Sequence, residues 1–456
     1  MNLFPFLKWE GQVQPILTVL SIIECLIFAF LFSVWILPET AVLRNTALIT
    51  GAIFAVLILK LSKNSLLVKE AIPIYLIALL FLWIIFLYIF YPNEPTAQFN
   101  EIKSIWKRVV LITIFAIGLG VSISIIKNKA YTWPIILVGF IAPILIYLIK
   151  WAYSFGFDHS ILSIRIPWLR VYDGSTLFYV PKSEYVAFSM PVLAIAIGQL
   201  GKALQEKRAL KSNAIYSLII LSITFLFYAQ NIKNGFIYEL FLIGIFLIRS
   251  IKYCFYSGGI SKKILTIFIF IFIGSMTMMH ISKNNSWKYF SEDFKIAINT
   301  SDHEEWKYAG EKGYPQRESG ATVSTSTYER LAWAVIGAKL ALESPAGYGL
   351  VENSFGPLVR KRWPEASKLL SHSHSGWIDL LLGVGIVGVS LIALSIFFVF
   401  IQNSSSDTVW AITINWALIG NILCWCTTEL AANTTFEVLI FWIVFGASLN
   451  IGRLKS

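Results

Sequence analysis

The chain has 456 residues, of which 57% are hydrophobic and only 14% are charged, and its mean hydropathy is +0.69. Soluble domains carry about 25% charged residues, so this composition excludes a water-soluble fold. The net charge of +11 does not indicate a nucleic-acid-binding protein, because the basic residues are spread over many short loops rather than gathered in one segment.

About twelve apolar runs follow one another along the chain. A hydrocarbon core about 30 Å thick requires about 20 residues of helix to cross it, and helices satisfy their backbone hydrogen bonds internally, as lipid demands. The sequence therefore predicts an all-α integral membrane protein with about twelve transmembrane helices. The expected spans are residues 17–37, 45–62, 72–91, 109–126, 132–152, 186–204, 213–230, 235–251, 263–282, 376–401, 410–426 and 435–452.

Two hydrophilic loops interrupt this series. Residues 1–282 hold the first nine spans and a secondary loop at 153–185, residues 283–375 form one large hydrophilic insertion, and residues 376–456 hold the last three spans. With both termini in the cytoplasm, lysine and arginine are more numerous in the cytoplasmic loops, as the positive-inside rule requires. Both hydrophilic loops then face the extracytoplasmic side, and loops this long are usually functional or disordered.

The large loop contains a predicted helix. The small polar stretch from Ser319 to Thr327 is typical of a flexible loop. Ser326-Thr-Tyr-Glu329 matches a capping box, and apolar residues then recur at helical spacing until Ser344-Pro345. Arg330 falls in the first turn of this helix, where the helix dipole disfavours a cation. We therefore expect an anionic group to compensate Arg330.

Arg330 and two histidines are the first candidates for chemistry. The guanidinium of Arg330 suits a phosphate, although a salt bridge to a loop carboxylate or to lipid phosphate is an alternative. His372 and His374 directly precede the apolar run at Trp377, where the helix dipole favours a neutral imidazole that can act as a general base. The alternatives are a hydrogen-bonded interfacial histidine or a His-x-His metal pair beside Asp379, for which no further ligands recur at fixed spacing.

Further ionisable residues lie in or beside the spans. The polar segment Asn231-Ile-Lys-Asn-Gly235 places Lys233 where it could hold a phosphate, and a simple Asn-Gly turn is the alternative. Glu24, Glu239 and Glu437 lie in or at the edge of spans, where ionisable groups are costly and usually paired or functional. Glu239 is close enough in sequence to be a structural partner of Lys233.

These motifs resemble those of bacterial O-antigen ligases, within the wider group of O-antigen ligases, polymerases and related oligosaccharide transferases. His374-Ser375, followed after nine residues by Gly385-Ile-Val-Gly388, is similar to the signature of the ligases. The stretch from Arg330 through Glu343-Ser-Pro-Ala-Gly347-Tyr-Gly349 resembles the arginine-containing loop helix and the Pro-x-Gly-x-Gly element of the family. At the eighth span the family has a Ser-Arg-Gly-like element, whereas this sequence has Lys233-Asn234-Gly235.

The resemblance implies a GT-C-like, metal-independent glycosyltransferase without a cofactor, in the bacterial inner membrane with its site facing the periplasm. The implied donor is a glycan on undecaprenyl diphosphate, and the implied acceptor is lipid A-core, both held among membrane lipids. His374 is then the general base and Arg330 neutralises the diphosphate. The expected substrate-binding residues are Lys233, Asn234, Arg165, Arg170 and His372.

Three other functions fit the same sequence. An O-antigen polymerase would use the same donor with a second lipid-linked glycan as acceptor, and a protein O-oligosaccharyltransferase would use a protein. A polysaccharide transporter, from a different class, would require polar residues in mid-membrane and discontinuous helices. The clustering of candidate residues at the outer interface argues against a transporter.

Overall fold

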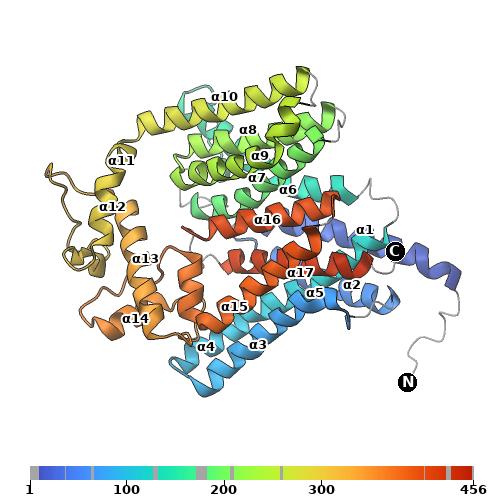
Figure 1. Ribbon diagram of the computed structural model, residues 1–456, viewed down its shortest axis with the longest axis horizontal. Coiled ribbons are helices and arrows are strands. Elements are labelled where there is room, and N and C mark those ends of the chain that lie inside the picture. Colours follow the sequence, from blue (N-terminus) through green and yellow to red (C-terminus); the bar gives the residue numbers. More distant parts are fainter. Residues whose placement is uncertain are drawn as a thin grey trace.

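The computed structural model describes residues 10–35, 37, 39–62, 66–126, 132–170, 182–205, 210–256, 260–404, 406–427 and 433–453. Within these ranges the regular elements are helices, and the only β-type pairing is a single bridge between Gln316 and Thr322. The long helices lie side by side, and the segment between α10 and α15 covers one end of them (Figure 1). α1 begins and α17 ends at the opposite end of this bundle.

Each expected span coincides with one long helix. The long helices are α1 (Glu10–Trp35), α2 (Ala41–Ser62), α3 (Ile72–Phe90), α5 (Lys107–Ile125), α6 (Thr132–Asp158), α7 (Lys182–Gln205), α8 (Leu210–Ala229), α9 (Lys233–Tyr256), α10 (Ile260–Lys283), α15 (Gly376–Ser404), α16 (Val409–Cys424) and α17 (Asn433–Arg453). Short elements connect them: η1 (Lys69–Ala71), α4 (Pro95–Glu101), η2 (Ile102–Trp106) and η3 (Pro167–Leu169).

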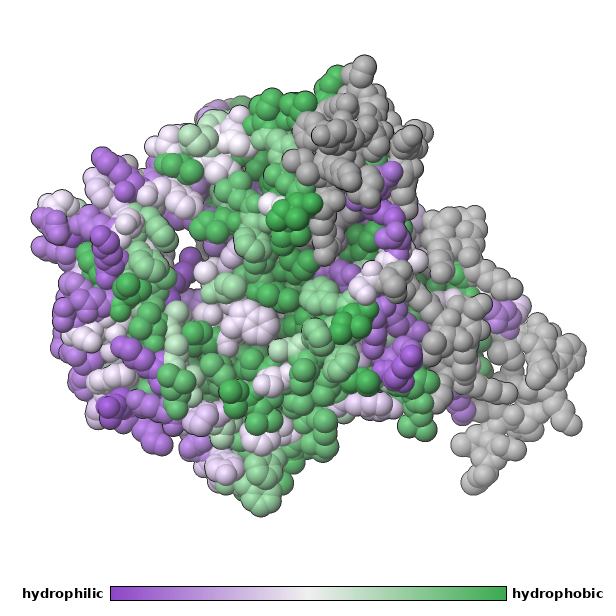
Figure 2. Space-filling view, in the orientation of Figure 1, coloured by the Kyte–Doolittle hydropathy of each residue, from purple (hydrophilic) through white to green (hydrophobic). Residues whose placement is uncertain are grey.

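Nine helices within the described ranges are long and apolar enough to cross a membrane. This agrees with an all-α, multi-pass membrane protein, while the number of twelve spans stays a prediction. α8 and α16 have shorter apolar stretches, and α9 carries the charged residues Lys233 and Glu239 within it. Hydrophobic residues cover the middle of the molecule and hydrophilic residues gather over the large loop (Figure 2), as a bilayer around the helices requires.

The large loop is a folded unit with its own hydrophobic core. It begins where α10 ends at Lys283, stops where α15 begins at Gly376, and contains α11 (Asn285–Lys288), α12 (Phe290–Ile298), η4 (Glu304–Tyr308), α13 (Thr325–Glu343) and α14 (Phe355–Arg362). Trp306, Tyr328 and Phe355 are buried in its core. This core is separate from the main core of the bundle but includes Leu382 of α15, so the beginning of α15 is one place where the loop is attached to the bundle.

α15 is interrupted at Gly385. This residue has φ 67° and ψ −174°, which is not a helical conformation and is readily accessible only to glycine. An interrupted helix leaves backbone groups without partners, and these groups cannot remain unpaired inside a membrane. One of them is satisfied from α3, where the indole Nε1 of Trp83 donates to the carbonyl of Val384 at 2.7 Å.

The segment Pro345–Gly349 of the large loop satisfies the other groups at the break. Three backbone hydrogen bonds join the two segments, from Tyr348 N to Leu382 O (2.7 Å), from Gly349 N to Gly383 O (2.8 Å) and from Ile386 N to Pro345 O (2.9 Å). This close approach requires glycine, since a Cβ at Gly347 would lie 2.7 Å from the carbonyl oxygen of Gly383 and closer still to the nitrogen of Gly385. The Pro-x-Gly-x-Gly element at Pro345–Gly349 and the motif that begins at Gly385 therefore contact each other directly.

Glu94, which caps α4, and Glu101, at the end of α4, bind the loop at and just after the same segment. The carboxylate of Glu101 accepts the backbone N–H groups of Val351 and Glu352, each at 2.8 Å. The hydroxyl of Tyr348 donates to Glu94 at 3.0 Å. The loop is thus fixed to α15 through backbone hydrogen bonds and to α4 through hydrogen bonds with two carboxylates.

Replacing Gly347 by alanine should lower the thermal stability of the protein. The positive φ of 92° alone costs a residue with a Cβ about 1–2 kcal/mol, and the added methyl group collides with the backbone of α15. Thermal unfolding in detergent measures the effect. The matched control is Gly274→Ala on α10, where a Cβ would meet nothing within 4 Å. Equal melting temperatures for the two variants would contradict the tight contact at the break.

Candidate functional site

Arg330 lies in the second turn of α13, because the helix begins at Thr325 with Ser324 as its N-cap. The predicted capping box is therefore wrong: the side chain of Ser324 makes no cap bond, and the carboxylate of Glu329 instead accepts the hydroxyl of Tyr314 at 2.6 Å. Burial, together with this carboxylate, raises the pKa of Tyr314 to about 12. The helix dipole acts mainly on the first turn, so it does not oppose Arg330 as the sequence suggested.

The residues before α13 form a closed turn rather than an open loop. The backbone N–H of Arg317 donates to Ala321 at 2.8 Å, and Gln316 pairs with Thr322. The prediction of a flexible loop from Ser319 to Thr327 missed this pairing, because a run of small polar residues gives no sign of a partner elsewhere. The start of α13 is consequently a well-defined position in the fold.

α13 packs closely against the beginning of α15. Gly337 provides the space, since a Cβ there would overlap the side chain of Ile378. One turn beyond Arg330, the indole of Trp333 stacks on the imidazole of His374, with ring centroids 4.9 Å apart and planes 12° from parallel. Trp333, which the sequence had not singled out, thus lies on the same helix as Arg330 and in contact with His374.

His374 has an unusual backbone conformation with φ 59°, which is uncommon for a residue other than glycine. Hydrogen bonds on both sides hold it there. The backbone N–H of Ser373 donates to the carboxylate of Asp379 at 2.7 Å, and the hydroxyl of Ser373 donates to the carbonyl of Ser375 at 3.1 Å. Asp379 therefore orders the polypeptide that carries His374, which gives it a structural role.

His372 is a neighbour of His374 rather than its equivalent. The two rings lie 4.9 Å apart at 76°, and Nδ1 of His372 is 2.7 Å from the hydroxyl of Ser371. Just upstream, the guanidinium of Arg360 donates to the carbonyl of Leu370 at 3.0 Å. α14 thereby helps to hold the segment that leads to both histidines.

Lys233 and Asn234 begin α9. The chain turns at Asn231, which has φ 55°, and Gly235 lies inside the helix, where a Cβ would meet the ring of Phe227 at 2.8 Å. The alternative of a simple Asn-Gly turn is therefore wrong, because the turn is built on Asn231. Glycine is needed at position 235 for helix packing.

The turn after α16 connects this helix end to the histidine segment. The hydroxyl of Thr427 accepts from Nδ2 of Asn234 at 3.3 Å and also bonds the hydroxyl of Tyr238. Two residues earlier, the carbonyl of Trp425 accepts the hydroxyl of Ser375 at 3.4 Å. Asn234 and Ser375, the residue after His374, are thus both hydrogen-bonded to the same short turn.

Arg330 and Lys233 are two neighbouring cations at this end of the bundle. The two side chains lie close enough for their charges to interact, and Arg330 also acts on Tyr238. Within the described ranges neither cation forms an ion pair with a carboxylate, so the expected anionic partner of Arg330 does not come from them. Two neighbouring cations of this kind favour binding of a phosphate or diphosphate.

Asp293, whose carboxylate acts on Lys233, already forms an ion pair with Arg317. Asp293 on α12 accepts two hydrogen bonds from Arg317, at 2.7 and 2.9 Å, and a third from the backbone N–H of Ser324 at 3.1 Å. The hydrogen bonds to Asp293 raise the pKa of Arg317. Because Arg317 satisfies both oxygens of Asp293, this carboxylate only partly offsets the charge of Lys233.

Arg165 and Arg170 belong to a different part of the surface. Arg170 donates to Asp158 at 2.6 Å and lies over the ring of Phe157, and Arg165 is exposed. In the part of the chain that the structure describes, no interaction joins either arginine to Arg330 or His374. Residues 171–181, which complete the secondary loop, lie outside the described ranges.

The buried glutamates each have a structural partner. The carboxylate of Glu24 accepts the hydroxyl of Ser122 at 2.7 Å, and Glu437 pairs with Arg108. Glu239 accepts the hydroxyl of Thr224, so the prediction that it partners Lys233 is wrong. The described residues contain no group of three or more histidine, cysteine, aspartate or glutamate side chains placed to hold a metal ion.

Asp293→Ala should destabilise the large loop. The change leaves the guanidinium of Arg317, which is 9% exposed, without its partner, and breaking a buried ion pair costs about 3–5 kcal/mol. Limited proteolysis between α12 and α13, together with thermal unfolding, measures the effect. Lys295→Ala, on an exposed position of the same helix, should behave as wild type. Equal protease resistance of the two variants would refute the role of Asp293.

No family model matches this sequence, and a search of curated proteins finds no match either.

Proposed function

We propose that the protein is a membrane glycosyltransferase of the O-antigen ligase type, which moves a glycan from undecaprenyl diphosphate to lipid A-core. The observation that carries this proposal is the pair Arg330 and Lys233, two interacting cations without a carboxylate partner in the described ranges, at the end of the bundle where His374 is held. A diphosphate leaving group needs such cations, and an acceptor hydroxyl needs a base.

In the proposed reaction, a hydroxyl oxygen of the acceptor attacks the anomeric carbon of the donor sugar. A bond forms between these atoms while the bond from the anomeric carbon to the diphosphate oxygen breaks, and that oxygen keeps the electron pair. His374 takes the proton of the hydroxyl, a role worth about 10² to 10⁴ in rate. Arg330 and Lys233 stabilise the negative charge that develops on the departing diphosphate.

The residues around His374 and Lys233 are consistent with these two roles, a base and a phosphate ligand. The stacking of Trp333 on His374 fixes the plane of the imidazole, so that its proton-accepting edge has a defined direction. The bond from Asn234 to Thr427 fixes the start of α9, where Lys233 begins the helix. Asn234 and Tyr238 then act as positioning residues for the phosphate-binding side of the site.

The interruption of α15 is a feature that a transporter would also have. Its backbone groups, however, bond to Pro345–Gly349 and to Trp83 rather than facing a path through the membrane. The break therefore attaches the loop to the bundle, which favours an enzyme over a transporter. A growing glycan or a protein remains an alternative acceptor, corresponding to an O-antigen polymerase or a protein O-oligosaccharyltransferase.

Loss of His374 or Arg330 should abolish transfer. A deletion strain complemented with His374→Ala or Arg330→Ala should lack long-chain glycan on lipid A-core, whereas His372→Ala should restore part of it, because His372 is expected to bind substrate but is not the base. The measurement is the lipopolysaccharide profile, with membrane levels of each variant determined in parallel. A normal ladder in the deletion strain would refute the ligase, and loss of glycan from a protein band would identify the protein transferase.

Substitutions of Lys233 show whether this residue is a phosphate ligand or has only a structural role. Lys233→Arg should keep most of the transfer activity, because the charge is preserved, whereas Lys233→Ala should lose it by about tenfold or more, the effect expected for one charge-assisted hydrogen bond. Transfer by purified protein from a lipid diphosphate donor measures both variants. Full activity of Lys233→Ala would assign the residue to the structure of the helix start.

A further inference from the structure

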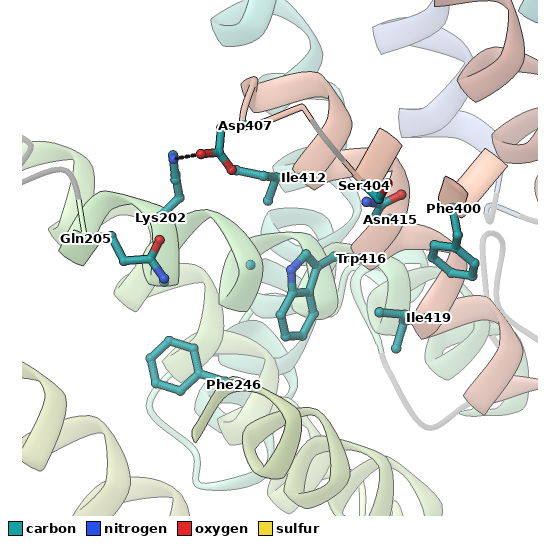
Figure 3. Close-up of a pocket in the computed structure, with 12 residues that line it drawn as sticks. Lys202, Gln205, Phe246, Phe400, Ser404, Asp407, Ile412, Asn415, Trp416 and Ile419 are labelled. Atoms are coloured by element: carbon teal, nitrogen blue, oxygen red, sulfur yellow. Dashed lines mark ion pairs between the residues drawn. The ribbon is translucent and has the colours of Figure 1, made fainter. Parts of the chain in front are cut away.

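A groove of about 610 Å³ lies at the end of the bundle opposite Arg330 and His374. Its floor is formed by α7 and α16, and the aromatic rings of Phe246 on α9 and Phe400 on α15 stand on either side (Figure 3). Trp416 lies between them. The groove therefore faces the leaflet of the membrane that is farther from the large loop.

The floor of the groove is held firmly. Gln199 on α7 donates through Nε2 to the carbonyl of Val409 at 2.7 Å and to the hydroxyl of Thr413 at 3.0 Å, both on α16. Gly198 allows the two helices to approach, since a Cβ there would overlap the ring of Trp416. The groove is consequently part of the fold and not a gap between loosely packed helices.

Charged and polar groups occupy one end of the groove. Lys202 and Asp407 form an ion pair at 3.0 Å at its mouth (Figure 3). The lysine side chain is only 11% exposed, whereas the aspartate side chain is 90% exposed, so the positive charge lies deeper than the negative one. Asn415, two turns along α16, adds an amide to the lining.

We propose that this groove binds one phospholipid with a zwitterionic, primary ammonium headgroup, as in phosphatidylethanolamine. In such a lipid the ammonium is outermost, the phosphate follows, and the glycerol esters and acyl chains lie deeper. The protein presents complementary groups in the same order. Asp407 receives the ammonium, Lys202 the phosphate, the amide of Asn415 an ester carbonyl, and the apolar lining the acyl chains.

The order of the charges decides between lipid classes. An anionic lipid such as phosphatidylglycerol also offers a phosphate to Lys202, but it has no cation for Asp407, whose carboxylate would repel it. A neutral lipid without phosphate would offer no anion to Lys202 and would gain nothing from the ion pair. Of these lipids, only the one with a primary ammonium offers an opposite charge to both Lys202 and Asp407 together with N–H donors for the carboxylate.

Lipid selectivity of the purified protein tests this site. The full chain is reconstituted in bilayers of equal parts phosphatidylethanolamine and phosphatidylglycerol with identical acyl chains, and the lipids that remain bound are identified by native mass spectrometry. Wild type should retain one phosphatidylethanolamine. Preferential retention of phosphatidylglycerol, equal retention of the two lipids, or no retained lipid would each overturn the proposal.

A charge-swapped variant separates recognition from folding. Lys202→Asp combined with Asp407→Lys keeps the ion pair but reverses the order of the charges, so retention of phosphatidylethanolamine should fall by about tenfold. Lys202→Gln removes only the positive charge and should show a similar loss of retention. It serves as the test if the double variant fails to fold. Lys69→Ala, at an exposed lysine of the same end of the bundle, should retain the lipid. Wild-type retention by the folded Lys202 variants would contradict the proposed contacts.

Discussion

The arrangement of this molecule depends on one constraint, which is that backbone groups freed inside a membrane must find partners. The non-helical conformation of Gly385 frees such groups in α15, and the segment Pro345–Gly349 supplies the partners. This contact attaches the large loop to the bundle directly after α13. It thereby brings the helix that carries Arg330 and Trp333 against the beginning of α15.

Cations of the described bundle differ in whether they have a carboxylate partner. Arg108 pairs with the buried carboxylate of Glu437, as the cost of burying a charge demands. At the loop end, Arg330 and Lys233 repel each other and have no carboxylate partner within the described ranges. Two cations held together by the fold in this way are stabilised when an anion binds between them, which links the geometry to a diphosphate substrate.

The helical architecture could be predicted from the sequence, because apolar runs of membrane length leave few alternatives to a helix. The run at 132–152, for example, corresponds to α6. Local signals were less reliable. The pattern Ser326-x-x-Glu329 fits a capping box, yet Ser324 is the N-cap, because several residues in this stretch are suitable caps. Contacts such as that between Thr427 and Asn234 join distant segments, so no local pattern could have indicated them.

The proposed roles are a base for His374 and diphosphate binding for Arg330 and Lys233. Their most direct test is the affinity for the donor, measured separately from its turnover. Binding of a lipid diphosphate-linked glycan to wild type, to His374→Ala and to the double variant Arg330→Ala with Lys233→Ala can be compared in nanodiscs. His374→Ala should bind the donor as wild type does, while the double variant should bind at least about tenfold more weakly. Equal binding by all three proteins, or a loss confined to His374→Ala, would contradict these roles.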